Sequence, residues 1–514
     1  MRQRHMNNDN VTDQSTSLSS LRMMIFPIFP KELPKFLPMA GLIFFTIFSF
    51  TMLRNMKDVL MLSAPGVKAA SLPYIKFCIV FPTSIVFSLI YIKLKNYLEF
   101  EKAYYAIMGF FISFFIVFNY LLYPNAELIH PSAESIAALQ NQIPVLSNFV
   151  GLLGVWSFTM YYVISELWGT YSLSVLFWQF ANDNVSTEES KRFYPLFILV
   201  GNIALLILSF ILDYISKNYT SSAAVDPVNN TVIFAGICML VLFRYTNQYI
   251  LSDPQYQPTS KKVKKKKAKL SMYDSLVQLS QSRYVLYIAV LVLSYGIMIN
   301  IFETVWKEQV RVFFTVDGVV DKSAMLGFMS KYTFYTGVFT IVLNFLSKDT
   351  VRLFGWLAGA VFTPIICTGA SLIFLIYSIN ASIFQPSLAA LGLGAWFAVY
   401  FGMGGVILTK SSKYAFFDPT KEMSFIPISS DLRTSGKAAV DGVGARLGKS
   451  GGGLIQIAVG TIITMFTGSP VDALQIAPYM LIVLAIMGFA WLTSAFNLNV
   501  LYQKAVAEEA TSNG

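Results

Sequence analysis

The sequence is poor in charged residues, in histidine and in cysteine. Only 13% of its 514 residues are charged, against about 25% in ordinary soluble domains. A soluble protein of this composition could not cover its surface with polar groups. The two histidines, His5 and His130, are too few to build a metal site. The three cysteines, Cys78, Cys238 and Cys367, stand far apart in apolar stretches, so we expect buried, reduced thiols and neither a metal nor a cofactor.

Apolar sequence is what the chain has in excess: 55% of its residues are hydrophobic and its mean hydropathy is +0.58. A membrane-spanning helix needs about 20 mostly apolar residues. The sequence therefore predicts an all-α integral membrane protein with twelve transmembrane helices. The expected spans are approximately 37–56, 72–94, 103–123, 147–168, 193–215, 230–250, 284–306, 325–346, 352–378, 384–409, 436–466 and 473–498. A shorter apolar stretch, 169–181, either continues the fourth span or re-enters the membrane.

A lysine-rich segment separates six spans from the other six. Seven lysines lie in "KKVKKKKAK" (Lys261–Lys269), and they account for most of the net charge of +10. The positive-inside rule places this segment in the cytoplasm, and with six spans on each side both termini follow. Attraction to anionic lipid is a further role for these lysines. We expect no nucleic-acid partner.

This pattern divides the chain into five parts. Two six-helix bundles joined by a basic linker are the plan of the major facilitator fold, in which substrate binds between the halves. The expected parts are a polar N-terminal tail (1–24), an N-terminal six-helix bundle (25–251), a basic cytoplasmic linker (252–275), a C-terminal six-helix bundle (276–500) and a polar C-terminal tail (501–514). The N-terminal tail lacks the apolar core of a secretory signal peptide.

Charged residues in or near the expected spans are candidates for a functional site, because a charge at mid-membrane costs roughly 2.5–3.5 kcal/mol. Arg54, Lys57 and Asp58 share one helical face at spacing i, i+3, i+4; snorkelling from the helix end is the alternative. No other charged residue lies within ten positions of Glu166 on either side. We therefore expect Glu166 to pair with a cation on another helix.

The second half carries similar candidates. Asn300 and Glu303, at i and i+3, could line a cavity, or Glu303 could pair with Lys307 on the helix surface. Lys410 and Lys413 follow the tenth span, where a cytoplasmic loop is the alternative to a site.

The stretch "GARLGKSGGG" (Gly444–Gly453) suggests a phosphate-binding loop. The P-loop pattern would require glycine at position 443, which is Val443, and it would follow a strand. Spacing and context both fail, so we exclude ATP hydrolysis at this stretch. Arg446 and Lys449, at i and i+3, still suit phosphate. The glycines either let backbone N–H groups approach an anion or let two membrane helices pack closely.

At these residues the chain resembles the ATP/ADP translocases of intracellular bacteria and plastids, the nucleotide transporter family. The resemblance covers about residues 25–500 and rests on several long motifs in the same order. They are "LRNMKDVL" (53–60), "SELWGTYSLSVLFWQFAN" (165–182), "KRFYPLF" (191–197), "SYGIMINIFETVWK" (294–307), "SKYAFFDPTKEM" (412–423) and "GARLGKSGG" (444–452).

The resemblance implies a twelve-helix carrier that is not an enzyme. It also implies that Lys57, Glu166, Glu303 and Lys449 are the functional charges, and Arg54 and Arg446 match the bacterial pattern. Together with Asn300, these are the substrate-binding residues we expect. The chain departs from the exchangers of the family at Asn55, where they have Asp, and at Ser435, where they often have a basic residue.

The hypothesis from sequence is uptake of host ATP in exchange for ADP and phosphate, by a monomer in the inner membrane of an intracellular bacterium. The plastid inner envelope ranks second as a location. A proton-coupled importer of other nucleoside triphosphates (GTP, UTP, CTP) is the first alternative. A membrane enzyme acting on phosphorylated lipids ranks lower, because His130 stands alone in "LIHPS" and no Asp-rich metal motif exists. Tyr161, Tyr162 and Trp168 either stack on the base or pack in the core.

Overall fold

The computed structural model describes residues 26–256, 282–390, 396–428, 436–437, 440 and 444–512. This part of the chain is helical apart from connecting turns and one small hairpin, as the sequence predicts. In the hairpin, β1 (Thr315–Val316) pairs antiparallel with β2 (Val319–Val320). Asp317 and Gly318 make the turn with φ of 50° and 80°, the conformation that a two-residue hairpin loop requires. The lysine run at 261–269 and the polar tail at 1–24 lie outside the described residues.

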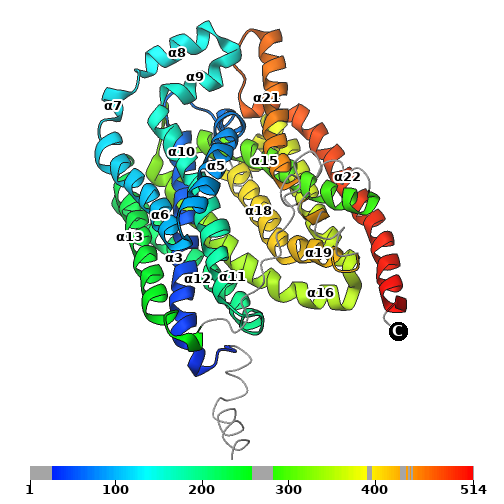
Figure 1. Cartoon of the computed structure of the whole chain (residues 1–514). Helices are drawn as coiled ribbons and strands as arrows, with labels where there is room; N and C mark the ends of the chain where they lie inside the picture. Colours follow the sequence, from blue (N-terminus) through cyan, green and yellow to red (C-terminus); the bar gives the residue numbers. More distant parts are fainter. Residues whose placement is uncertain are drawn as a thin grey trace, which may run out of the picture.

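The first half consists of helices, several of which continue through π-helical turns. α3 and α12 begin next to each other at the side where the described chain starts, which we call the N-terminal side (Figure 1). In chain order the elements are η1 (Pro30–Glu32), α3 (Leu33–Leu62), α4 (Ser71–Tyr74), η2 (Ile75–Val80), α5 (Phe81–Tyr97), α6 (Phe100–Val117), η3 (Phe118–Leu122), α7 (Ala126–Ile129), α8 (Ala133–Gln142), η4 (Pro144–Leu146), α9 (Ser147–Gly154), α10 (Trp156–Trp168), η5 (Gly169–Phe177), α11 (Trp178–Asn184), α12 (Thr187–Asn218), α13 (Val225–Tyr245), η6 (Thr246–Ile250) and η7 (Pro254–Tyr256).

The second half is built in the same way. Its longest element, α16, covers two expected spans, and its helical geometry is interrupted at Gly355, where φ is 81° and ψ is 178°. A φ of this size is strained for any residue with a Cβ. The elements are α15 (Arg283–Phe313), α16 (Lys322–Ile379), α17 (Ala381–Ala390), α18 (Trp396–Ser412), η8 (Lys413–Phe417), α19 (Asp418–Ser424), α21 (Ala445–Thr467) and α22 (Ala473–Ser512).

The number of spans is lower in the described residues than the twelve expected from sequence. Nine of the described helices are long and apolar enough to cross a membrane, and a tenth results if one bent pair is counted. The expected span at 325–346 lies inside α16. The expected span at 384–409 is divided between α17 and α18, and 391–395 between them lie outside the described residues. The exact count of twelve therefore stays a prediction.

The fourth expected span, 147–168, is wrong as a single straight helix. The chain bends by 80° between Pro144–Gly154 and Trp156–Asn184. Val155 at the bend has φ of −109° and ψ of 48°, outside the helical region. α9 is held on the molecule because Gly151 packs against the carbonyl oxygen of Gly66 and Gly154 against Ile136. The span begins at Trp156 and continues through η5 into α11, so the stretch 169–181 extends the fourth helix.

α3 and α15 are the central helices of the two halves. In each, 67% of the most apolar 18-residue window is buried inside the protein, whereas the corresponding share in Ser71–Tyr97 is 6%. The charged residues buried in these two helices include Lys57, Asp58 and Lys307. The expectation of buried thiols is correct only for Cys367: Cys78 is exposed and Cys238 is partly exposed, although all three are free.

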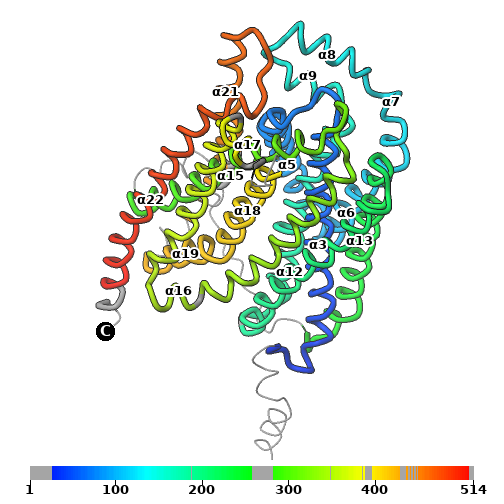
Figure 2. Tube along the Cα trace, turned by 180° about the vertical axis from the view of Figure 1, so that it is seen from behind, coloured from blue at the N-terminus to red at the C-terminus, as the bar shows by residue number. Residues whose placement is uncertain are grey.

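The halves touch at the side of the molecule that carries α8 and α9, which we call the closed side (Figures 1 and 2). There Ser330 of α16 donates a hydrogen bond to the carbonyl oxygen of Ser209 on α12 (2.9 Å), and Ser323 donates to that of Tyr219 (2.7 Å). The Tyr74 hydroxyl lies 3.4 Å from the Thr461 hydroxyl of α21. These contacts close one side of the interface between the halves.

Candidate functional site

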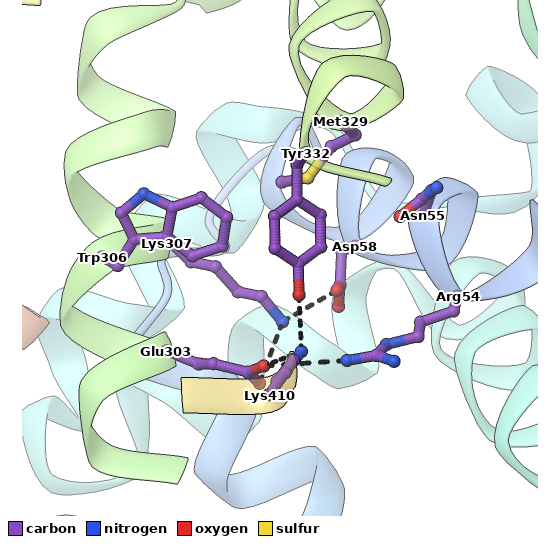
Figure 3. A pocket seen from close by; sticks show the side chains of 9 residues that line it. All are labelled: Arg54, Asn55, Asp58, Glu303, Trp306, Lys307, Met329, Tyr332 and Lys410. Carbon is purple, nitrogen blue, oxygen red and sulfur yellow. Dashed lines mark hydrogen bonds and ion pairs between the residues drawn. The ribbon is translucent and has the colours of Figure 1, made fainter. Parts of the chain in front are cut away.

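A small pocket lies between the halves, lined by four helices. The space that no atom fills is about 240 Å³, counting the part open to solvent. Its side chains come from α3, α15, α16 and α18. The polar ends of Arg54, Glu303, Lys307, Tyr332 and Lys410 point toward one another (Figure 3). The lining residues are Arg54, Asn55, Asp58, Glu303, Trp306, Lys307, Met329, Tyr332 and Lys410.

An ion pair between Asp58 and Lys307 crosses the interface at the pocket. Lys307 Nζ donates to Asp58 Oδ2 at 2.7 Å, and both side chains are 8% exposed. Asp58 follows Lys57 in α3, and Lys57 Nζ lies 3.3 Å from its other oxygen. One carboxylate is thus shared by a cation from each half. Removing it would leave two buried ammonium groups without this partner.

Glu303 on α15 is shared by three cations. Arg54 of α3 lies 3.8 Å away and Lys307, one turn further along α15, lies 3.9 Å away. Lys410 of α18 is in direct contact with Glu303 and donates a second hydrogen bond to the Tyr332 hydroxyl at 2.7 Å (Figure 3). The surface pair of Glu303 with Lys307 that the sequence offered as an alternative therefore exists, but within the pocket.

Glu166 is paired with a cation on another helix, as its surroundings in the sequence predicted. Lys57 Nζ lies 2.8 Å from Glu166 Oε1 and 3.7 Å from the centre of the Tyr162 ring. The cation–π contact and the ion pair together hold the Lys57 ammonium between α3 and α10. Tyr161, Tyr162 and Trp168 are all fully buried, so packing is their role in this structure rather than stacking on a ligand.

Two further sequence candidates, Arg446 and Lys449, lie in α21, but their side chains are outside the described residues. The glycines around them pack against α15. A Cβ on Gly448 would stand 3.2 Å from the Val292 carbonyl oxygen, and one on Gly452 would stand 2.9 Å from that of Ile297. The helix-packing interpretation of "GKSGGG" is therefore correct for these two glycines.

Asn300, the remaining candidate, lies on α15 and accepts a hydrogen bond of 3.5 Å from Lys76 Nζ. Lys76 was missed, although a lysine inside the apolar segment "LPYIKFCIVFP" is a signal of the kind used for Glu166. The sequence predicts either a loop or a site for Lys410, because it follows the expected end of a span; the side chain is 7% exposed and lines the pocket. The sequence places Asp58 on one face with Arg54 and Lys57 and offers Lys307 as a partner of Glu303, but it does not include either among the expected substrate-binding residues.

The described charges of this cluster are five cations (Arg54, Lys57, Lys76, Lys307, Lys410) and three carboxylates (Asp58, Glu166, Glu303). An excess of two positive charges remains in a largely buried site. Buried charges are costly unless paired, and such residues inside membranes usually mark a substrate pathway. The arrangement suits an anionic ligand that can compete with carboxylates for several cations.

The family model described as TLC ATP/ADP transporter matches residues 11–502. The chain belongs to this family. It is 39% identical over 503 residues to ADP,ATP carrier protein 1 of Chlamydia trachomatis serovar D, covering 95% of this chain and 92% of that protein. It is 35% identical over 505 residues to ADP,ATP carrier protein 1 of Rickettsia bellii, covering 97% and 99%. The family consists of transporters, so an enzymatic function is set aside.

The fold is that of major-facilitator-like transporters. A solved structure of a bacterial homologue of the iron transporter ferroportin, in an inward-facing state, aligns with a TM-score of 0.53 at 11% identity. The alignment covers 93% of this chain and 99% of that one. At this identity the likeness speaks to the fold alone.

Proposed function

We propose that this protein takes up ATP in exchange for ADP, with phosphate also moving, and that Arg54, Lys57, Glu166, Asn300, Glu303, Arg446 and Lys449 form its substrate site. The observation that carries the proposal is the ion-pair cluster between the halves, with five cations against three carboxylates. ATP carries close to four negative charges. Relatives of this protein in Chlamydia and Rickettsia are named ADP,ATP carrier proteins.

When no nucleotide is bound, the carboxylates pair with the cations that would otherwise bind its phosphates. Glu166 holds Lys57, and Glu303 holds Arg54 and Lys410. Without them, several like charges would be buried together, at a cost of several kcal/mol each. A phosphate group that displaces Glu303 or Asp58 from a cation exchanges one ion pair for another, so binding avoids most of that cost.

The replacement of carboxylates by phosphates next to the cations gives a reason for obligatory exchange. In the structure, Asp58–Lys307 and Arg54–Glu303 connect α3 of the first half to α15 of the second. Reorientation of the halves must break these pairs without replacement. With a nucleotide bound, its phosphates take over the cations, and the barrier falls. Net movement of an empty carrier is therefore slow, and movement of a loaded one is fast.

The proposed location is the inner membrane of an intracellular bacterium, with both termini in the cytoplasm. The start of α3 and the end of α22 lie on the same side of the molecule (Figure 1). The basic segment at 261–269 favours the cytoplasm by the positive-inside rule. The N-terminal side is then cytoplasmic and the closed side faces outward. The protein is expected to work as a monomer.

Uptake into proteoliposomes tests this proposal. Purified protein is reconstituted with or without internal ADP, and entry of radiolabelled ATP is followed with and without a proton gradient. We expect uptake to require internal ADP, to be unaffected by the gradient, and to return intact nucleotide. Labelled GTP, UTP and CTP serve as matched substrates. Uptake of these nucleotides into empty vesicles, driven by the gradient, would instead establish the proton-coupled importer.

A further inference from the structure

Lys76 occupies an unusual position in the second span. It lies in η2, the π-helical turn between α4 and α5, and its side chain is partly buried. Its Nζ reaches across to Asn300 Oδ1 on α15 of the other half, at 3.5 Å. π-Helical turns inside α-helices occur frequently at functional sites. An amide oxygen at this distance is a weak partner for an ammonium group.

The other four cations of the cluster differ from Lys76 in having a carboxylate partner. Arg54, Lys57, Lys307 and Lys410 each lie within 4.0 Å of Asp58, Glu166 or Glu303. Among the described residues, Lys76 has no such partner. The charges that act on it are Lys307 and Lys57, which repel it, and Glu303 and Asp58, which attract it.

An ammonium group inside a membrane protein is costly unless an anion faces it. No carboxylate of the described chain pairs with Lys76, but a transported nucleotide that binds among these charges would bring several negative charges close to it. We propose that Lys76, oriented by Asn300, binds a phosphate group of that nucleotide and is a further substrate-binding residue. This inference rests on the proposed function.

The chemistry of the position favours phosphate over the base. The Lys76 ammonium is a compact point charge with up to three hydrogen-bond donors. Such a group suits a phosphate oxygen, and it discriminates little between the neutral edges of different bases. Because Lys76 lies on the first half and Asn300 on the second, a phosphate bound here would contact both halves. It would thereby add to the contacts that hold the loaded carrier together.

Kinetics of Lys76→Gln give the first test. We expect the KM for ATP exchange to rise at least about tenfold, as is typical when a charged hydrogen bond is lost, with a smaller effect on the maximal rate. Lys76→Arg keeps the charge and should recover part of the affinity. Lys93→Gln is the matched control, since Lys93 is exposed near the end of the same helix; its KM should equal that of the unchanged protein.

Thermal unfolding of the purified protein separates binding from a structural role. A cation without an ion-pair partner destabilises the empty protein, so Lys76→Gln should unfold at the same or a higher temperature without ligand. The increase in unfolding temperature that saturating ATP produces should become smaller. A lower unfolding temperature without ligand, together with an unchanged ATP effect, would overturn the inference and make Lys76 a structural residue.

Asn300→Asp provides a second variant that keeps Lys76 in place. The new carboxylate would supply Lys76 with an ion-pair partner inside the chain, and it would compete with phosphate. We expect a higher KM for ATP and a more stable empty protein. If the protein without substitutions exchanges nucleotides normally and both Lys76→Gln and Asn300→Asp keep its KM, the inference about Lys76 is wrong and the proposed function stands. If the protein without substitutions exchanges no nucleotide, the proposed function itself is wrong.

Discussion

The closed side and the N-terminal side of the molecule differ in how the halves are connected. On the closed side, hydrogen bonds cross between α12 and α16, and the Ala69 backbone N–H donates to Glu308 Oε2 at 2.7 Å. On the N-terminal side, the described polar contacts stay within one half. Lys35 pairs with Glu189 at 2.8 Å in the first half, and the Tyr284 hydroxyl donates to the Ser424 carbonyl oxygen at 2.6 Å in the second.

This difference concerns the polar contacts that join the halves. Each half is tied to itself on the N-terminal side, and between described residues no hydrogen bond or ion pair joins the halves there. Among the described residues, the polar contacts that join the halves lie at the central charges and on the closed side.

The largest effect is expected from a covalent bond across the closed side. Ser330 donates to the carbonyl oxygen of Ser209 from the opposite half. A Ser209→Cys, Ser330→Cys variant, oxidised to a disulfide, should lose ADP-dependent ATP uptake, because the halves could no longer separate there. A reductant should restore it. Uptake is measured in proteoliposomes before and after reduction.

A control for this experiment places the same chemistry within one half. Thr363 on α16 donates to the Ser412 carbonyl oxygen on α18 at 3.0 Å, and both residues belong to the second half. The oxidised Thr363→Cys, Ser412→Cys variant should retain uptake. Equal loss in both variants would mean that crosslinking itself, and not separation at the closed side, stops transport.

Loss of the carboxylate at the centre should have the next largest effect. Asp58→Asn removes the buried carboxylate that Lys307 and Lys57 share. Breaking a buried pair in this way costs about 3–5 kcal/mol, which unfolding of the purified protein would reveal. Asp418→Asn removes the 2.6 Å partner of Lys413 within the second half, where Asp418 is 36% exposed; about 0–1 kcal/mol is expected. Similar losses in both variants would contradict the distinction between centre and side.

The smallest effect is expected from Glu308→Gln. Glu308 is 1% exposed and also accepts hydrogen bonds from Arg311. Its neutral replacement cannot satisfy both partners, and about 1–3 kcal/mol should be lost from closed-side contacts. If the closed side opens more often, an impermeant maleimide should react faster with Ser330→Cys. The rate of labelling is measured in a protein from which the native cysteines have been removed. Glu134→Gln, at an exposed position of α8 on the same side, should leave labelling unchanged; unchanged labelling with Glu308→Gln would exclude a role in closure.

The sequence predicted the core of the site because charges are costly in a membrane. The shared helical face of Arg54, Lys57 and Asp58 and the isolation of Glu166 are visible in the sequence alone, and the structure brings them together with Glu303. Lys410 was harder to place. Span ends are read where charges begin, so a buried charge near a span end is indistinguishable from a loop residue.

The bend at Val155 could not be predicted from apolarity. Residues 147–168 are apolar enough for one straight helix. The break depends on α9 packing against Gly66 and Ile136, which are distant in sequence. Likewise, Gly448 and Gly452 could serve an anion or a helix contact until the position of α15 is known. The local sequence pattern shows which residue types are present. Only the tertiary packing decides whether the glycines contact a helix or an anion, and whether the span is straight or bent.

The tight seating of α21 on α15 has a practical consequence for engineering. At positions 448 and 452 the obstacles to a methyl group are chiefly main-chain atoms, which cannot rotate out of the way. Variant libraries aimed at altered substrate preference should therefore keep both glycines fixed. Diversity is better directed to flexible side chains that line the cavity, where a change in volume can be absorbed locally.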